Sequence, residues 1–97
     1  YQKKQTKSLK FGEKIVIDQY SAQLVSITIP TNAYKNGRAI VSLYKDKEKI
    51  LEGIFASGSS IIYRTNKDTI AMHIRKIIPN LDPGRRQAEI SLSIMKR

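Results

Sequence analysis

Apolar and polar residues alternate along most of this chain, and that alternation restricts the folds open to it. In the stretch DTIAMHIRKI, Ile70, Met72 and Ile74 fall on one face of an extended strand, opposite a mostly polar face. In AEISLSIM, every second residue from Ala88 to Ile94 is apolar. A helix would instead repeat its apolar residues every three to four positions, and no window does so convincingly. The pattern predicts half-buried antiparallel strands.

Two earlier runs follow the same rule. LVSITI places Val25, Ile27 and Ile29 on one face, and RAIVSLYK has apolar residues on both of its faces. Residues on one face of a strand pack against a neighbouring layer, so these runs define an expected core. The residues predicted to be buried together are Ile27, Ile29, Val41, Leu43, Ile70, Met72, Ile74, Ile90 and Leu92.

Turn signals separate the runs. Asn36-Gly37 is typical of a two-residue type I′ hairpin turn, and Pro83-Gly84 is typical of the centre of a type II turn. YKDKEK indicates a charged reversal between two further strands. About seven strands at hairpin spacing predict an all-β fold, an immunoglobulin-like antiparallel β-sandwich, with a small barrel as the alternative architecture.

Length and composition limit the number of domains and the kinds of chemistry that this chain can have. The 97 residues are enough for one domain, and the absence of cysteine excludes disulfides and thiolate chemistry. No run approaches the roughly 18 apolar residues of a membrane span. No signal peptide is recognisable, so an extracellular location requires a targeting segment outside this sequence.

The net charge of +10 is concentrated near the two ends of the chain. Residues 1–14 carry five lysines and one acid, residues 75–97 carry six basic and two acidic residues, and the segment between them has a net charge of +2. Such charge suits an anionic surface, nucleic acid or an acidic protein partner, or serves only solubility. The candidate contacts to a polyanion or partner are Lys3, Lys4, Lys7, Lys10, Arg85, Arg86, Lys96 and Arg97.

The basic N-terminal segment is predicted to divide near Lys7. Residues 1–8 form a basic arm and residues 9–97 form the single sandwich domain. The first residues of the arm have little apolar surface to bury and are expected to be solvated. Leu9 and Phe11 are two positions apart, so they would share one face of an edge strand and pair along a sheet edge.

Chemistry-bearing motifs are scarce. His73 is the single histidine and is expected to lie on a strand surface. The acidic residues between Lys45 and Glu52 alternate with lysines, as surface ion pairs do, and lack the oxygen ligands of a calcium loop. Neither a glycine-rich phosphate loop nor a nucleophile motif is present. We therefore expect no enzyme activity, no cofactor, no metal and no small-molecule substrate.

The order of motifs resembles the β-sandwich modules of archaeal surface-layer and related secreted cell-surface proteins. The resemblance covers roughly residues 9–94 and is carried by LKFGE, AIVSLYKD, DTIAMHI and AEISL. Two features differ from that pattern, since the chain is basic and has no Asn-x-Ser/Thr sequon. The resemblance implies a sandwich with a structural role at a cell surface.

We therefore expect a non-enzymatic structural or adhesive module of a cell-surface or extracellular assembly, with a protein partner or self-assembly. One alternative is a small basic nucleic-acid-binding β-barrel of cytoplasmic type, which would need exposed aromatic side chains among its cations. Another is a pilus-like filament subunit, completed when a terminal strand of one chain enters the sheet of a neighbour.

Overall fold

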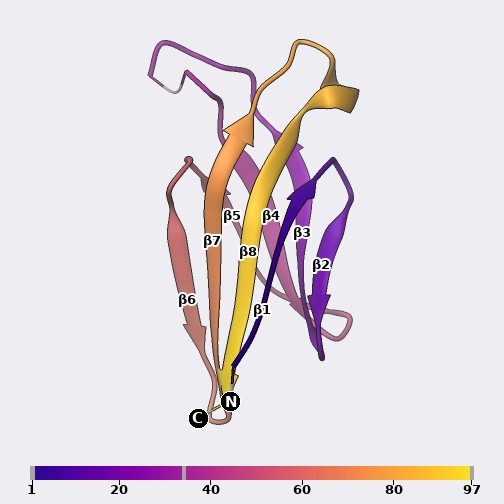
Figure 1. Ribbon diagram of the computed structural model, residues 1–97, viewed down its shortest axis with the longest axis vertical. Helices are drawn as coiled ribbons and strands as arrows, with labels where there is room; N and C mark the ends of the chain where they lie inside the picture. The colour runs from indigo at the N-terminus through magenta and orange to yellow at the C-terminus, as the bar shows by residue number, and fades with distance from the viewer. Residues whose placement is uncertain (1, 34, 97) are drawn as a thin grey trace.

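The fold is an all-β antiparallel sandwich, as predicted (Figure 1). The structure is a computed structural model that describes residues 2–33 and 35–96. Its strands are β1 (Gln2–Leu9), β2 (Lys14–Ile17), β3 (Tyr20–Ile27), β4 (Ala39–Lys45), β5 (Glu48–Phe55), β6 (Ser60–Arg64), β7 (Asp68–Ile78) and β8 (Gln87–Lys96), and a 3-10 helix covers Pro83–Arg85.

The strands form two four-stranded sheets. Sheet A has the order β1-β8-β7-β6 and sheet B has the order β2-β3-β4-β5. Successive hairpins build most of each sheet, and the chain changes sheet only between β1 and β2 and between β5 and β6. The pairs β1 with β2 and β6 with β5 therefore form the two lateral sides of the sandwich (Figure 1).

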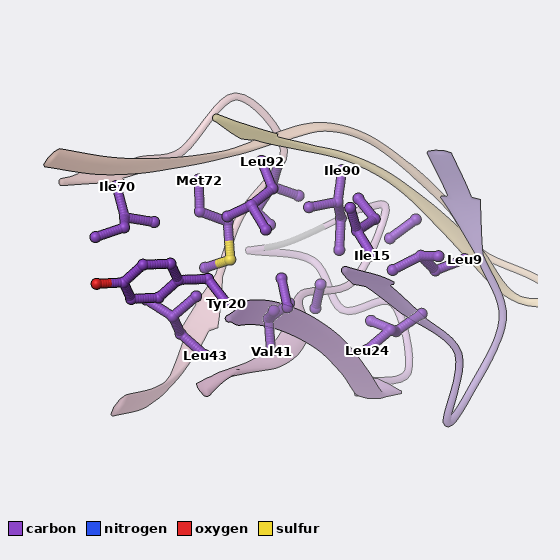
Figure 2. Close-up of a cluster of buried hydrophobic side chains, with 14 of the residues drawn as sticks. Leu9, Ile15, Tyr20, Leu24, Val41, Leu43, Ile70, Met72, Ile90 and Leu92 are labelled. Carbon is purple, nitrogen blue, oxygen red and sulfur yellow. The ribbon is translucent and has the colours of Figure 1, made fainter. Parts of the chain in front are cut away.

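An apolar layer fills the space between the sheets. Figure 2 shows Ile70, Met72 and Leu92 of sheet A directed toward Tyr20 and Leu43 of sheet B. Eight of the nine side chains predicted to form the core are buried, and they are Ile27, Val41, Leu43, Ile70, Met72, Ile74, Ile90 and Leu92.

The ninth predicted core residue, Ile29, is exposed because β3 ends at Ile27, and a β-bulge within β3 also interrupts the predicted alternation. The register of β3 on β4 shifts between Leu24 and Ser26, which inserts Val25 as an unpaired residue. Leu24 and Ile27 are therefore both buried, while Val25 is 42% exposed. Ile29 lies beyond the end of β3 and is 67% exposed.

The expected division of the basic arm near Lys7 is also wrong. Strand β1 pairs antiparallel with β8 along its full length, from Gln2 opposite Met95 to Leu9 opposite Ala88. Seven of its eight residues are nevertheless exposed, and Leu9 alone is buried in it. Backbone pairing at a sheet edge does not require apolar side chains, so the lack of apolar residues did not imply an unpaired segment.

Phe11 does not share an edge strand with Leu9. It lies in the turn that follows β1, where the backbone N–H of Glu13 donates to the carbonyl of Lys10 at 3.0 Å. The Glu13 carboxylate accepts a further bond from the Lys10 N–H at 2.7 Å. The turn leaves Phe11 half-buried against the core.

Both predicted turn types are wrong. Residues 28–38 form a longer connection in which Gly37, but not Asn36, has a positive φ. Pro83 begins a 3-10 helix, and the carboxylate of Asp82 accepts from the N–H of Gly84 at its start. The two-residue hairpin turns begin instead at Asp18 and Asp46, whose φ angles are 53° and 54°.

Truncating the core tests the packing of the two sheets. We expect Ile74→Ala or Leu92→Ala to lower the free energy of unfolding by about 2–5 kcal/mol, because each leaves a cavity among buried side chains. Ile29→Ala is the matched control and should change it by less than about 0.5 kcal/mol. Urea denaturation measures all three, and similar losses for Ile29→Ala and Ile74→Ala would contradict the core assignment.

Gly37 tests the connection between β3 and β4. Its φ is +73°, and a Cβ atom at this position would collide with the backbone carbonyl oxygen of Thr28. Gly58 has a φ of +87° but open space around the same position. We expect Gly58→Ala to cost about 1 kcal/mol from backbone strain alone and Gly37→Ala to cost clearly more. Equal losses in melting temperature would show that the contact with Thr28 is unimportant.

Candidate functional site

A buried carboxylate joins the two sheets at the end of the sandwich where the hairpin turns lie. Asp68 is the first residue of β7 in sheet A and is 1% exposed. Tyr20, the first residue of β3 in sheet B, donates from its hydroxyl to Asp68 Oδ2 at 3.0 Å. The ammonium of Lys96 lies 2.9 Å from Asp68 Oδ1, and Lys96 is the residue paired opposite Asp68 in β8.

The turn before β7 fixes the backbone of Asp68. The Thr65 hydroxyl accepts from the N–H of Asp68 at 2.9 Å and from the N–H of Lys67 at 3.2 Å. The N–H of Thr65 in turn donates to the carbonyl of Asp68 at 2.8 Å. A serine or threonine turn of this kind holds the start of a strand without a glycine.

The partners of Asp68 stabilise its ionised form. The hydrogen bond from Lys96 holds the pKa of the Asp68 carboxyl below its usual value and outweighs the opposing effect of burial. Tyr20 and the charge of Lys45 act in the same direction. Burial raises the pKa of the Tyr20 phenol, and its hydrogen bond to ionised Asp68 raises it further.

A polar cavity of about 330 Å³ adjoins this cluster and is lined by Gln19, Lys45, Thr65, Asn66, Lys67 and Asp68. Its lysines disfavour a metal cation, and among residues 2–33 and 35–96 no group of three acidic or histidine side chains could hold a metal. The Asp68 carboxylate is already bound by Tyr20 and Lys96. We assign it a structural role in holding the sheets together.

The structure gathers most of the predicted basic residues along one border of sheet A. Because β1 pairs antiparallel with β8, Lys3, Lys4 and Lys7 lie beside the C-terminal strand. Lys96 is the last residue of β8, while Lys10 follows β1 and Arg85 precedes β8. Arg97 lies outside the described residues.

Several of these cations have intramolecular partners. Lys3 lies 2.7 Å from Asp18, and Arg85 lies 3.8 Å from Asp82. The Arg86 guanidinium donates to the carbonyls of Asn80, at 2.6 Å, and Ile27, at 3.4 Å. These contacts join loops and strands, so Lys3, Arg86 and Lys96 have structural roles that their charge alone did not indicate.

Strand β1 directs charged side chains toward the inside of the sandwich. Lys3 and Lys7 are paired with Ile94 and Ile90, so they share the face of sheet A that packs on sheet B. The other face of β1 is polar, and the Thr6 hydroxyl lies 2.8 Å from that of Ser91. Inward-facing lysine on an edge strand discourages a further strand from pairing there.

His73 lies on the outer face of sheet A. It is paired opposite Ser60, and its Nδ1 lies 2.6 Å from the Ser60 hydroxyl oxygen. Ser91 is the next residue in the same row, on β8. The pair belongs to a flat strand surface, where the two side chains connect β6 to β7.

Tyr44 is brought next to basic residues from other strands, which its own strand did not indicate. It lines a shallow hollow of about 240 Å³ on the outer face of sheet B together with Lys14, Ser21, Gln23, Asp46 and Lys47. The pairing of β2, β3 and β4 creates this grouping. Sequence spacing along one strand cannot reveal such a set.

The lateral side formed by β5 and β6 has a different character. Each of its residues is exposed or half-buried. Apolar side chains nevertheless predominate on it, and we define the β5–β6 side by Leu51, Ile54, Phe55, Ile61, Ile62 and Tyr63. No motif in the sequence marked this side. The available signal was the consecutive pairs Ile50-Leu51, Ile54-Phe55 and Ile61-Ile62, which place apolar side chains on both faces of a strand.

The chain was compared with known families and proteins. No family model matches it, and neither a curated protein nor a solved structure matches it. Within residues 2–33 and 35–96, no helix is long and apolar enough to cross a membrane.

The Asp68 cluster predicts how stability depends on pH. Because the pKa of Asp68 is lowered on folding, its contribution is present above the ordinary aspartate value of about 3.9 and is lost as the pH falls below it. Because the pKa of Tyr20 is raised, its contribution is present below about 10 and is lost as the pH rises above it.

Melting temperatures of two variants test these two losses of stability, one at low pH and one at high pH. Compared with the wild type, Asp68→Asn should be less stable at neutral pH, and the difference should shrink as the pH falls below about 4. Tyr20→Phe keeps the ring and should be less sensitive to pH above about 10. A constant difference between wild type and Asp68→Asn from pH 7 to pH 2 would contradict the ionised hydrogen-bonded cluster.

Proposed function

We propose that the chain is a non-enzymatic structural or adhesive module of a cell-surface or extracellular assembly, which associates through its β5–β6 side. The observation that carries the proposal is the difference between the two lateral sides of the sandwich. The side formed by β1 and β2 carries inward-facing lysines. The β5–β6 side carries half-buried and exposed apolar side chains next to two free strand edges.

An unprotected strand edge with apolar neighbours is suited to association with another chain. Its backbone groups can pair with an added strand, and its side chains lose exposed apolar surface when they are covered. Leu51 and Phe55 of β5 and Ile61 and Tyr63 of β6 pack against the core without being fully buried by it. Ile54 and Ile62 lie on the outer faces of the same two strands and are 55% and 60% exposed.

The polar groups of the sandwich support a structural role. The buried carboxylate of Asp68 connects the sheets, and the His73 and Ser60 side chains connect neighbouring strands. The terminal strand β1 occupies a place in its own sheet, beside β8. Association through the β5–β6 side is therefore better supported than donation of the N-terminal strand to a neighbour.

Self-association tests this proposal. At rising concentration, the wild type should increase in mass in size-exclusion chromatography with light scattering. Ile54→Lys or Ile62→Lys should weaken association at least tenfold, since burial of an isoleucine side chain contributes about 1.5–3 kcal/mol and about 1.4 kcal/mol is a tenfold change.

Val16→Lys is the matched control. Val16 is 49% exposed on the opposite lateral strand, β2, so the same change should leave association unaltered. A wild type that stays monomeric at all concentrations, or equal losses for Val16→Lys and Ile54→Lys, would contradict the proposed interface. The location is tested separately by antibody labelling of intact cells, and labelling that appears only after lysis would contradict a surface role.

A further inference from the structure

Two loops at one end of the sandwich expose apolar side chains. Leu81 is 94% exposed and Ile29 is 67% exposed, the two largest values among the described large apolar side chains. Leu81 lies in the loop 79–86, between β7 and β8, and Ile29 lies in the connection 28–38, between β3 and β4. Figure 1 shows both loops projecting from the same end, opposite the hairpin turns and the chain termini. We call this the loop end.

Hydrogen bonds from Arg86 join the Leu81 loop to the end of β3, the strand that leads to Ile29. Arg86 donates from Nε to the carbonyl of Asn80 at 2.6 Å and from Nη1 to the carbonyl of Ile27 at 3.4 Å. The first carbonyl belongs to the Leu81 loop, and the second ends the strand that leads to Ile29. The Asp82 carboxylate accepts from Gly84 N at 3.0 Å and begins the 3-10 helix after Leu81. Leu81 and Ile29 therefore follow backbone segments that hydrogen bonds hold in place.

The same loops are basic. The segments 28–38 and 79–86 together contain Lys35, Arg38, Arg85 and Arg86 and the single acidic residue Asp82. The carboxylate of Asp82 lies 3.8 Å from the Arg85 guanidinium, so its charge is partly compensated. Lys76 and the exposed Ile78, near the end of β7, extend the combination of cations and apolar surface toward the body of the sheet.

We propose that the loop end docks on an anionic lipid surface, with Leu81 and Ile29 inserted among the headgroups and the neighbouring cations facing lipid phosphates. A bilayer offers apolar chains directly beneath a negatively charged layer, which matches exposed apolar side chains on two basic loops. A nucleic acid would use the cations and leave Leu81 in water. A protein interface of ordinary size would need a broad complementary surface and not two separate exposed side chains.

This inference goes beyond the proposed function, because it concerns the loop end and not the β5–β6 side. The two surfaces lie on different parts of the sandwich, so one face can associate with protein while the loop end contacts lipid. Failure of either one is detectable without the other, since self-association is measured in the absence of lipid.

Co-sedimentation with vesicles tests the proposal. The wild type should bind vesicles of phosphatidylcholine and phosphatidylserine and bind phosphatidylcholine alone much more weakly. Leu81→Ser and Ile29→Ser should each reduce binding to the anionic vesicles by about tenfold, because each removes an apolar side chain that the bilayer would bury. Lys35→Gln with Arg85→Gln should reduce binding and flatten its dependence on salt.

Val16→Ser is the matched control, because Val16 is 49% exposed on β2, outside the β5–β6 side and away from the loop end. It should leave binding unchanged. Absence of binding to the anionic vesicles would overturn the proposal. Binding that depends on Lys35 and Arg85 but not on Leu81 and Ile29 would also overturn it. Such binding would indicate a site for any polyanion, nucleic acid included.

Discussion

The hydrogen bond between Tyr20 and Asp68 is the buried directional contact on which the alignment of the two sheets depends within the core, while Lys3 with Asp18 and Arg86 with Ile27 join them near the surface. The layer between the sheets is otherwise apolar, and apolar contacts are largely indifferent to small sliding movements. A buried carboxylate is costly without partners, and Lys96 reaches it from the same sheet, so it favours the alignment in which Tyr20 of the other sheet also reaches it. Apolar burial alone would hold the sheets together without fixing their alignment. The cluster favours one relative position of the two sheets.

The two lateral sides of the sandwich differ in how far their free strand edges are protected from pairing with another chain. On one side, β1 completes sheet A with residues that contribute almost nothing to the core, and its lysines face inward. On the other side, apolar side chains of β5 and β6 pack against the core but stay partly exposed. A chain with one protected and one unprotected side has a preferred direction for association, which limits the geometries an assembly could take.

Much of the fold was predictable from the alternation of apolar and polar residues. The positions that this alternation predicted wrongly have local causes. The alternation correctly located β4, β7 and β8, but a single inserted residue at Val25 moved the buried positions in β3. Asp68 was predictable in principle, since it shares the face of Ile70 and Met72 two positions apart. Its partner Tyr20 was not, because the contact between sheets joins residues 48 positions apart. The grouping of Leu81 with Ile29 was hidden for the same reason, as it depends on which loops the topology brings to one end.

The pairing of β1 with β8 also decides how the sandwich responds to mechanical tension. Gln2 lies opposite Met95 in neighbouring antiparallel strands, so the described chain enters and leaves at the same end. A force that separates these ends loads the hydrogen bonds between the two strands one after another, as in opening a zipper, and never all at once. The sandwich would therefore yield from its terminal strands at low force, whereas tension applied across its faces would meet the whole apolar layer.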